Sequence, residues 1–246
     1  MTEGLKNPER VIGFHFFNPV AVMPLLEVAR TSKTDDATTA TAINVGKELK
    51  KTMIICKDAP GFVVNRLLTR FMGEVTDAMD EGTAPDVADN AMRPLGFPMS
   101  PFELLGLVGP GVALHVAETL HDNLGPRYRI SPTMQRLVKE GVKTFYVKTE
   151  NGFSPNPAAL ALVEKGNTPS TSEEVRARAL KALAEEARMM LDEGVVATPA
   201  EIDLCMLLGA GWPMHLGGIL PYLDREGISE SVTGKRFHQP GVASLA

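Results

Sequence analysis

The sequence has little cysteine, no long hydrophobic run and no excess of positive charge. Two cysteines occur in 246 residues, and both Cys56 and Cys205 lie in apolar runs. They are typical of buried thiols in a reducing compartment, not of a disulfide framework. No stretch approaches the roughly 20 apolar residues of a membrane span. With a net charge of −5 and no basic stripe, nucleic acid is not an expected partner. We therefore expect a cytoplasmic protein without a membrane span.

The amino-acid composition of the chain is that of a soluble globular protein. Apolar residues make up 44% and charged residues 22% of the chain. The 22 glycines and 18 prolines indicate frequent loops, but no tract has low complexity. This composition excludes a collagenous, coiled-coil or disordered chain.

Three short apolar segments at the start of the chain predict strands, at residues 11–17, 25–29 and 53–56. Between the second and the third, residues 34–51 predict a helix, with acidic residues in its first turn and lysines near its end. Three strands form only a small α/β layer, and buried parallel strands need neighbours on both sides. Either they lie at a sheet edge, or the rest of the sheet is missing.

After Pro60 the pattern changes to helices. The expected helical ranges are 62–81, 86–95, 102–124, 131–140, 173–193 and 199–208. The prolines and polar residues of 153–172 indicate a linker, and after Thr233 we expect an extended tail.

The helical part contains an internal repeat of three blocks in the same order. The blocks pair Met79–Gly82 with Leu191–Gly194, Asp86–Asp89 with Ala200–Asp203, and Leu95–Met99 with Ala210–Met214. This agreement predicts two copies of one helical module, packed on each other. A structural role without chemistry is the better interpretation of the second copy.

His15 and Glu27 are the polar residues of two apolar strands. An unpaired buried carboxylate is costly, and no Lys or Arg lies within either segment. His15 is the nearest suitable partner, and we expect an imidazole nitrogen within about 2.6–3.2 Å of the carboxylate. Such a pair fixes the imidazole tautomer, as a general base requires, but a buried structural ion pair is equally compatible with the spacing. Asn65, early in a helix among apolar residues, either binds a substrate or ties the backbone.

Other motifs are weak. Gly-x-Gly occurs at 109–111 and 209–211, but neither pair follows a strand or has the third glycine of a dinucleotide fingerprint. Glu118 and His121 resemble half of a di-iron motif that has no second half, so we expect no metal. There is no Gly-x-Ser-x-Gly, and a hydrolase with a nucleophile elbow has no support.

Taken together, these residues resemble the L-3-hydroxyacyl-CoA dehydrogenase family. The matching motifs are 13–20 (GFHFFNPV), 23–28 (MPLLEV), 58–68 (DAPGFVVNRLL) and 96–104 (GFPMSPFEL). The duplicated helical module is similar to the multifunctional α-subunit of the fatty-acid β-oxidation complex. The resemblance covers nearly the whole chain except about the last dozen residues.

The resemblance implies a mainly α fold: duplicated helical modules preceded by the last strands of an incomplete Rossmann (α/β) domain. The expected domains are a remnant of the NAD-binding domain at 1–58, a first helical domain at 59–150, a linker at 151–172, and a second helical domain with the tail at 173–246.

The resemblance also implies roles for the site residues. His15 matches the catalytic histidine that takes the 3-hydroxyl proton while hydride passes from C3 to NAD. Glu27 matches the carboxylate that orients this histidine, and Asn65 matches the asparagine near the reacting oxygen of the substrate. The implied activity is the NAD-dependent oxidation of 3-hydroxyacyl-CoA to 3-ketoacyl-CoA in lipid degradation.

The chain departs from the family pattern in one respect. The strand, Gly-x-Gly-x-x-Gly turn and helix that open the dinucleotide domain are absent from the sequence, as are the substrate-contacting serine and the hydratase region. We expect a fragment that retains no cofactor-binding residues and does not bind NAD alone. The alternative is a non-catalytic helical interaction or assembly module. A thiolase β-subunit and a second copy of the chain are the possible protein partners.

Overall fold

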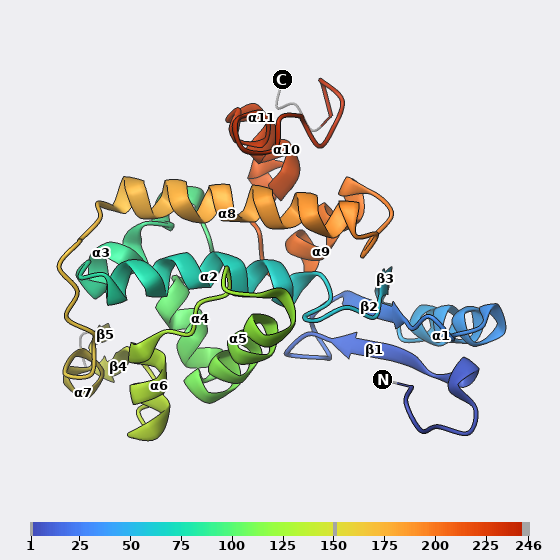
Figure 1. Ribbon diagram of the computed structural model, residues 1–246, viewed down its shortest axis with the longest axis horizontal. Helices are drawn as coiled ribbons and strands as arrows, with labels where there is room; N and C mark the ends of the chain where they lie inside the picture. Colours follow the sequence, from blue (N-terminus) through green and yellow to red (C-terminus); the bar gives the residue numbers. More distant parts are fainter. Residues whose placement is uncertain (1, 150–151, 243–246) are drawn as a thin grey trace. The chain divides into compact units, whose positions relative to one another are not determined.

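The computed structural model describes residues 2–149 and 152–242. It consists mostly of helices with two small sheets (Figure 1). The chain divides into two compact units, one formed by Met1–Arg66 with Ala184–Ala246 and the other by Leu67–Leu183. The division falls within the two longest helices, α2 (Val64–Asp80) and α8 (Ser172–Asp192).

The first unit contains a three-stranded sheet in the order β1-β2-β3, formed by Ile12–Phe16, Leu25–Arg30 and Thr52–Lys57. All three predicted strands are confirmed. Strands β1 and β2 are antiparallel, whereas β2 and β3 are parallel and are joined through α1 (Asp36–Glu48). The sheet is therefore mixed, with an antiparallel edge strand.

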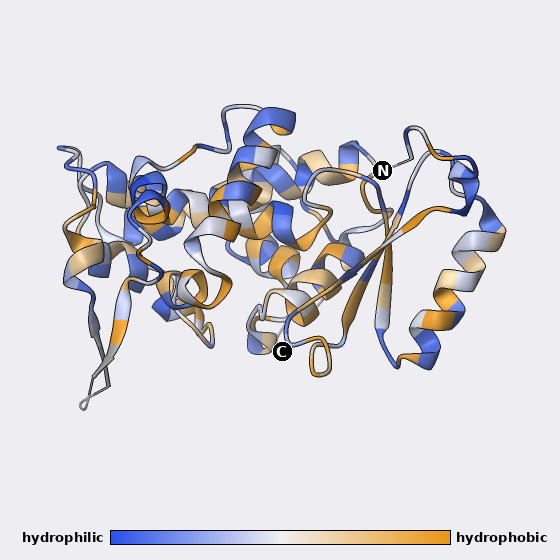
Figure 2. Cartoon of the chain, turned by 90° about the horizontal axis from the view of Figure 1, so that it is seen from below, coloured by the Kyte–Doolittle hydropathy of each residue, from blue (hydrophilic) through white to orange (hydrophobic). Residues whose placement is uncertain are grey.

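One face of this sheet packs on α1. Buried Leu26, Val28 and Ala42 form a cluster with the half-buried side chains of β1 and Met53. The strands carry mostly hydrophobic residues (Figure 2). Burial of their alternating apolar side chains fixes the register, because a slip of one residue would turn every side chain to the other face.

The other face of the sheet meets α9 (Pro199–Gly209). A Cβ atom on Gly209 would lie 2.6 Å from the Leu25 side chain and 3.0 Å from that of Val64. The last turn of α9 therefore approaches β2 and the start of α2 at a distance that only glycine allows. The first unit continues with η3 (Met214–Leu216), α10 (Ile219–Arg225) and α11 (Ile228–Thr233), and it begins with η1 (Pro8–Arg10).

The second unit is helical apart from one hairpin. Its helices besides α2 and α8 are α3 (Pro85–Asn90), η2 (Arg93–Leu95), α4 (Pro101–Val108), α5 (Pro110–Leu124), α6 (Pro132–Lys139) and α7 (Pro157–Leu160). The hairpin consists of β4 (Tyr146–Thr149) and β5 (Gly152–Pro155).

The helix starts follow from local sequence. Ser100 and Glu103 form a capping box at α4, and Thr198 and Glu201 form another at α9. Ser131 caps α6 with Pro132 at its first position, as expected.

The stretch expected to be a linker is partly ordered into β5 and α7. The Thr168 N–H donates to the Glu81 carbonyl at 2.8 Å, and a Cβ on Gly82 would lie 2.5 Å from the Gly166 carbonyl oxygen. This stretch is thus packed against the turn that follows α2. The domain boundaries expected from the sequence, after residues 58, 150 and 172, stay a prediction.

No single helix in residues 2–149 and 152–242 is long and apolar enough to cross a membrane. Helices α4 and α5 together reach the required length and composition, but they are bent by 98°.

Asp77 is a buried carboxyl group on α2 in the second unit. Burial raises its pKa to about 7, against the opposing charge of Arg129, whose Nε lies 3.7 Å away. The negative charges of Glu74, Asp80 and Glu81 add to the rise. Near neutral pH, the folded state therefore binds a proton at Asp77 that the unfolded chain has released.

This proton makes stability depend on pH. Because the folded-state pKa exceeds the unfolded value of 3.8, the contribution of Asp77 is present at about pH 4 and is lost as the pH rises through about 7. We expect Asp77→Asn to flatten this part of the profile and to stabilise the protein by about 1–3 kcal/mol at pH 8. Urea unfolding at pH 5 and pH 8 measures both effects. An equal change at both pH values would contradict the assignment.

Candidate functional site

His15 and Glu27 lie directly opposite each other on the antiparallel strands β1 and β2. The His15 Nδ1–H donates to Glu27 Oε2 at 2.6 Å. The Glu27 side chain is 0% exposed, whereas 28% of the His15 side chain is accessible. The predicted contact is confirmed. It follows from the strand register, which places two side chains of one face across from each other.

The second oxygen of Glu27 holds the start of α2. Oε1 accepts the N–H groups of Val63 and Val64 at 3.1 and 2.9 Å. These donors belong to the positive N-terminal end of a helix, which favours a carboxylate. An ionised carboxylate only accepts hydrogen bonds, so the Glu27 side chain fixes the imidazole tautomer with hydrogen on Nδ1.

Two aromatic rings flank the His15 imidazole. The centroid of the Phe17 ring lies 4.7 Å from that of the imidazole, in an edge-on arrangement. The centroid of the Phe62 ring lies 5.6 Å from it, in a tilted arrangement. Phe62 has a φ of +46°, an unusual value for a residue other than glycine. This strained backbone conformation lies in the turn between β3 and α2. The other imidazole nitrogen, Nε2, has no partner among the described residues and is left as a free acceptor beside an apolar wall.

Asn65 is the second residue of α2, next to Val64. Its side chain is half-buried and forms no hydrogen bond within the described part of the chain. The amide is therefore available to a bound molecule. It does not serve as a tie to the backbone, which was the alternative considered from the sequence.

The sequence did not single out Arg66, the next residue along. This side chain is fully buried and pairs with Glu186 and Glu193. The only indication in the sequence is that this charged residue lies between the apolar pairs Val63–Val64 and Leu67–Leu68. The partners are more than a hundred residues away, so no local pattern reveals them.

Both cysteines are free and buried, as predicted. Burial, followed by the charge of Glu27, raises the pKa of the Cys56 and Cys205 thiols. Neither is a thiolate at neutral pH, so neither serves as a nucleophile. The described residues also contain no group of three or more side chains that could hold a metal ion.

The strand-to-helix junctions show which anions the sheet can hold. A dinucleotide pyrophosphate normally rests on free N–H groups at such a junction. After β2, the N-cap Asp35 accepts the Thr38 N–H at 2.7 Å, and Asp36 lies in the first turn of α1. After β3, Glu27 occupies the first N–H groups of α2. Carboxylates occupy both junctions, so neither fits a pyrophosphate.

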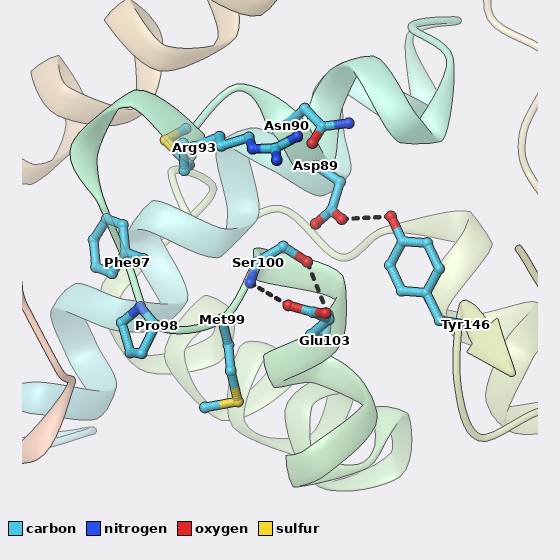
Figure 3. Close-up of a pocket in the computed structure, with 10 residues that line it drawn as sticks. Asp89, Asn90, Arg93, Phe97, Pro98, Met99, Ser100, Glu103 and Tyr146 are labelled. Carbon is cyan, nitrogen blue, oxygen red and sulfur yellow. Dashed lines mark hydrogen bonds between the residues drawn. The ribbon is translucent and has the colours of Figure 1, made fainter. Parts of the chain in front are cut away.

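A pocket of about 370 Å³ lies in the second unit, beside α3, the turn before α4 and Tyr146 (Figure 3). Asp89 forms its buried wall, accepting the N–H of Phe102 at 2.8 Å and the hydroxyl of Tyr146. Glu103 closes the capping box with Ser100. The polar atoms of these two carboxylates bind neighbouring helix starts and the Tyr146 hydroxyl.

Two family models match the chain in succession. Residues 1–59 match the model described as "3-hydroxyacyl-CoA dehydrogenase, NAD binding domain". Residues 61–155 match that described as "3-hydroxyacyl-CoA dehydrogenase, C-terminal domain". The first match ends within the turn that leads from β3 into α2.

Curated relatives carry the name fatty acid oxidation complex subunit alpha. The chain is 34% identical over 237 residues to that of Shewanella amazonensis and 33% identical over 265 residues to that of Acinetobacter baylyi. The alignments cover 92% and 98% of this chain but 33% and 37% of those proteins. The chain thus spans about a third of the length of these relatives.

Solved structures are also similar. The 3-hydroxybutyryl-CoA dehydrogenase of Escherichia coli matches with a TM-score of 0.71 over 97% of this chain and 70% of its own. At 23% identity, this likeness concerns the fold alone. FadB2 of Mycobacterium tuberculosis is 35% identical, with a TM-score of 0.53, over 56% of this chain and 50% of its own.

Removing the Glu27 carboxylate should weaken the first unit. Glu27→Ala leaves two buried backbone N–H groups and the imidazole without an acceptor, at a cost of about 1–3 kcal/mol for each buried donor. We expect a total loss of about 3–5 kcal/mol in urea unfolding. Glu27→Gln keeps one carbonyl acceptor and should lose less than half as much. Equal losses in the two variants would show that the acceptor geometry is not what stabilises this turn.

Proposed function

The chain belongs to the 3-hydroxyacyl-CoA dehydrogenase family, and from this premise we propose that it supplies the general base of an L-3-hydroxyacyl-CoA dehydrogenase of fatty-acid β-oxidation. The reaction is the NAD-dependent oxidation of 3-hydroxyacyl-CoA to 3-ketoacyl-CoA. The observation that carries the proposal is the 2.6 Å contact between His15 and a fully buried Glu27.

His15 is the base in this proposal. Its Nδ1–H is committed to Glu27, so the lone pair of Nε2 receives the proton of the 3-hydroxyl group. The imidazolium that results lies against the Glu27 carboxylate, which compensates the new positive charge. The rings of Phe17 and Phe62 limit the access of water to one side of the imidazole.

Asn65 orients the substrate in this proposal. Its amide has no internal partner and lies on the helical turn that also binds Glu27. An amide N–H donates to the oxygen on C3 both as hydroxyl and as ketone, so it keeps this oxygen in place while its proton moves to His15.

NAD is the hydride acceptor of the reaction when it is bound. The two strand-to-helix junctions of this sheet do not fit its pyrophosphate, because carboxylates occupy both. In this proposal the described residues contribute the base and the orienting groups, and the pyrophosphate does not rest at either of these two junctions.

The helical part is a duplicated module in this proposal, and paired aspartates support it. Asp203 accepts the N–H of Leu220, the second residue of α10, at 2.8 Å and the His238 Nε2–H at 2.7 Å. Asp89, at the matching repeat position, accepts the N–H of the second residue of α4 and the hydroxyl of Tyr146. Each aspartate thus caps the next helix and binds one aromatic donor.

Assembly is also part of the proposal. The curated relatives are named as α-subunits of a complex, which supports a larger assembly. A thiolase β-subunit as the other component is a prediction from the family resemblance. A homo-oligomer and a cytoplasmic location remain predictions from the sequence. A purely structural helical module is the alternative function, and the activity of His15 variants separates the two.

His15→Gln tests the catalytic role. In the complete dehydrogenase we expect kcat to fall by about 10²–10⁴-fold, because glutamine cannot accept the hydroxyl proton. The KM for 3-hydroxyacyl-CoA should change little, since the oxygen can still be bound. Steady-state kinetics followed by NADH absorbance gives both values. Turnover near that of the unaltered protein would remove His15 from the mechanism.

The isolated chain should not bind NAD measurably. Asp35 and Asp36 at the start of α1 repel the pyrophosphate, and Glu27 already accepts the first N–H groups of α2. Isothermal titration calorimetry of the 246-residue chain with NAD should show no heat of binding. Binding in the micromolar range would mean that another part of the chain holds the cofactor.

A further inference from the structure

Arg66 is a fully buried arginine in the first turn of α2. Its Nε donates to Glu186 Oε1 at 2.6 Å, and Glu186 is also 0% exposed. Its two terminal nitrogens donate to the two oxygens of Glu193 at 2.6 and 3.0 Å. One planar guanidinium thus binds two carboxylates in fixed directions, which a lysine ammonium does not reproduce.

The charges within this cluster keep the arginine ionised. Burial alone would lower the pKa of Arg66, but the hydrogen bonds that it donates to Glu193 and the charge of Glu186 outweigh burial and raise the pKa. Ion pairs of this kind add little net stability compared with a well-packed apolar core. Their directional bonds do fix the geometry of the segments that they join.

Glu193 lies in the turn that follows α8, and this turn also binds the last residue of β3. The Lys57 N–H donates to the Val195 carbonyl at 2.8 Å, and the Lys57 ammonium reaches the Glu193 carbonyl at 3.5 Å. Residues 193–195 therefore bind the connection between β3 and α2 on both sides, at Lys57 and at Arg66. This connection contains Phe62 and the two N–H groups that Glu27 accepts.

We propose that Arg66, held by Glu186 and Glu193, is a positioning residue that sets the place of the α2 start and, through Glu27, of His15. The inference rests on the proposed function for its effect on catalysis. The path is short and contiguous: the guanidinium fixes the first turn of α2, this turn donates to Glu27, and Glu27 orients the imidazole.

Glu193→Gln is the main test, because Glu193 is 43% exposed and its loss does not leave a fully buried charge without a partner. The substitution keeps one acceptor and removes the paired carboxylate contact. Glu164→Gln is the matched control: Glu164 is 41% exposed and binds Arg136 at 2.7 Å, away from this turn. Arg66→Lys is a second variant that keeps the charge but loses the planar geometry.

The first measurement is hydrogen exchange, which does not depend on enzyme activity. We expect hydrogen exchange of the Val63 and Val64 amides in the 246-residue chain to be about 10-fold faster in Glu193→Gln. The Leu220 amide, which donates to a buried carboxylate in the same unit, is the internal reference and should not change. Unchanged exchange at Val63 and Val64, or equal acceleration at Leu220, overturns the proposal.

The second measurement uses the complete dehydrogenase. Glu193→Gln should lower kcat by roughly 5- to 50-fold with little change in KM, whereas Glu164→Gln should leave both unchanged. Normal kcat in Glu193→Gln overturns the link to catalysis. If His15→Gln retains full turnover, the proposed function fails instead, and amide exchange still decides the role of Arg66. If Arg66→Lys does not fold, Glu193→Gln decides both questions.

Discussion

The buried carboxylate of Glu27 joins three elements that the backbone alone would leave independent. It lies on the central strand β2, accepts from the edge strand β1 through His15, and caps the start of α2. Three N–H donors compensate the cost of burying it. The orientation of the imidazole, the strained turn at Phe62 and the direction in which α2 leaves the sheet all depend on this group.

The residues that hold Arg66 lie far along the chain. Arg66 and Lys57 bind the turn after α8, which contains the segment Asp192–Gly194. A segment of the same sequence, Asp80–Gly82, follows the end of α2, and there Glu81 binds Arg178 and Arg129. The same three residues thus end a helix in both places, while the glutamate has different partners.

The strands could be predicted from the sequence because they are short apolar segments. The pair of His15 and Glu27 could be predicted because each is the polar residue of one such segment. The antiparallel pairing of β1 and β2 was not predicted, since the periodicity of a strand does not define its direction. The Arg66 cluster could not be found, because its partners are 120 and 127 residues away. The β4–β5 hairpin was missed because its residues are polar and close to glycine and proline.

The separation between Arg66 and Glu193 also bears on the order in which the protein forms. During synthesis the three strands, α1 and the first turn of α2 leave the ribosome before the 127 residues that end at Glu193. Until then, the guanidinium of Arg66 lacks the two carboxylates that it binds in the folded protein. The sheet can pair early, but the arginine becomes buried only after α8 has been made. Closure of this long-range contact is therefore a later step than the pairing of the strands.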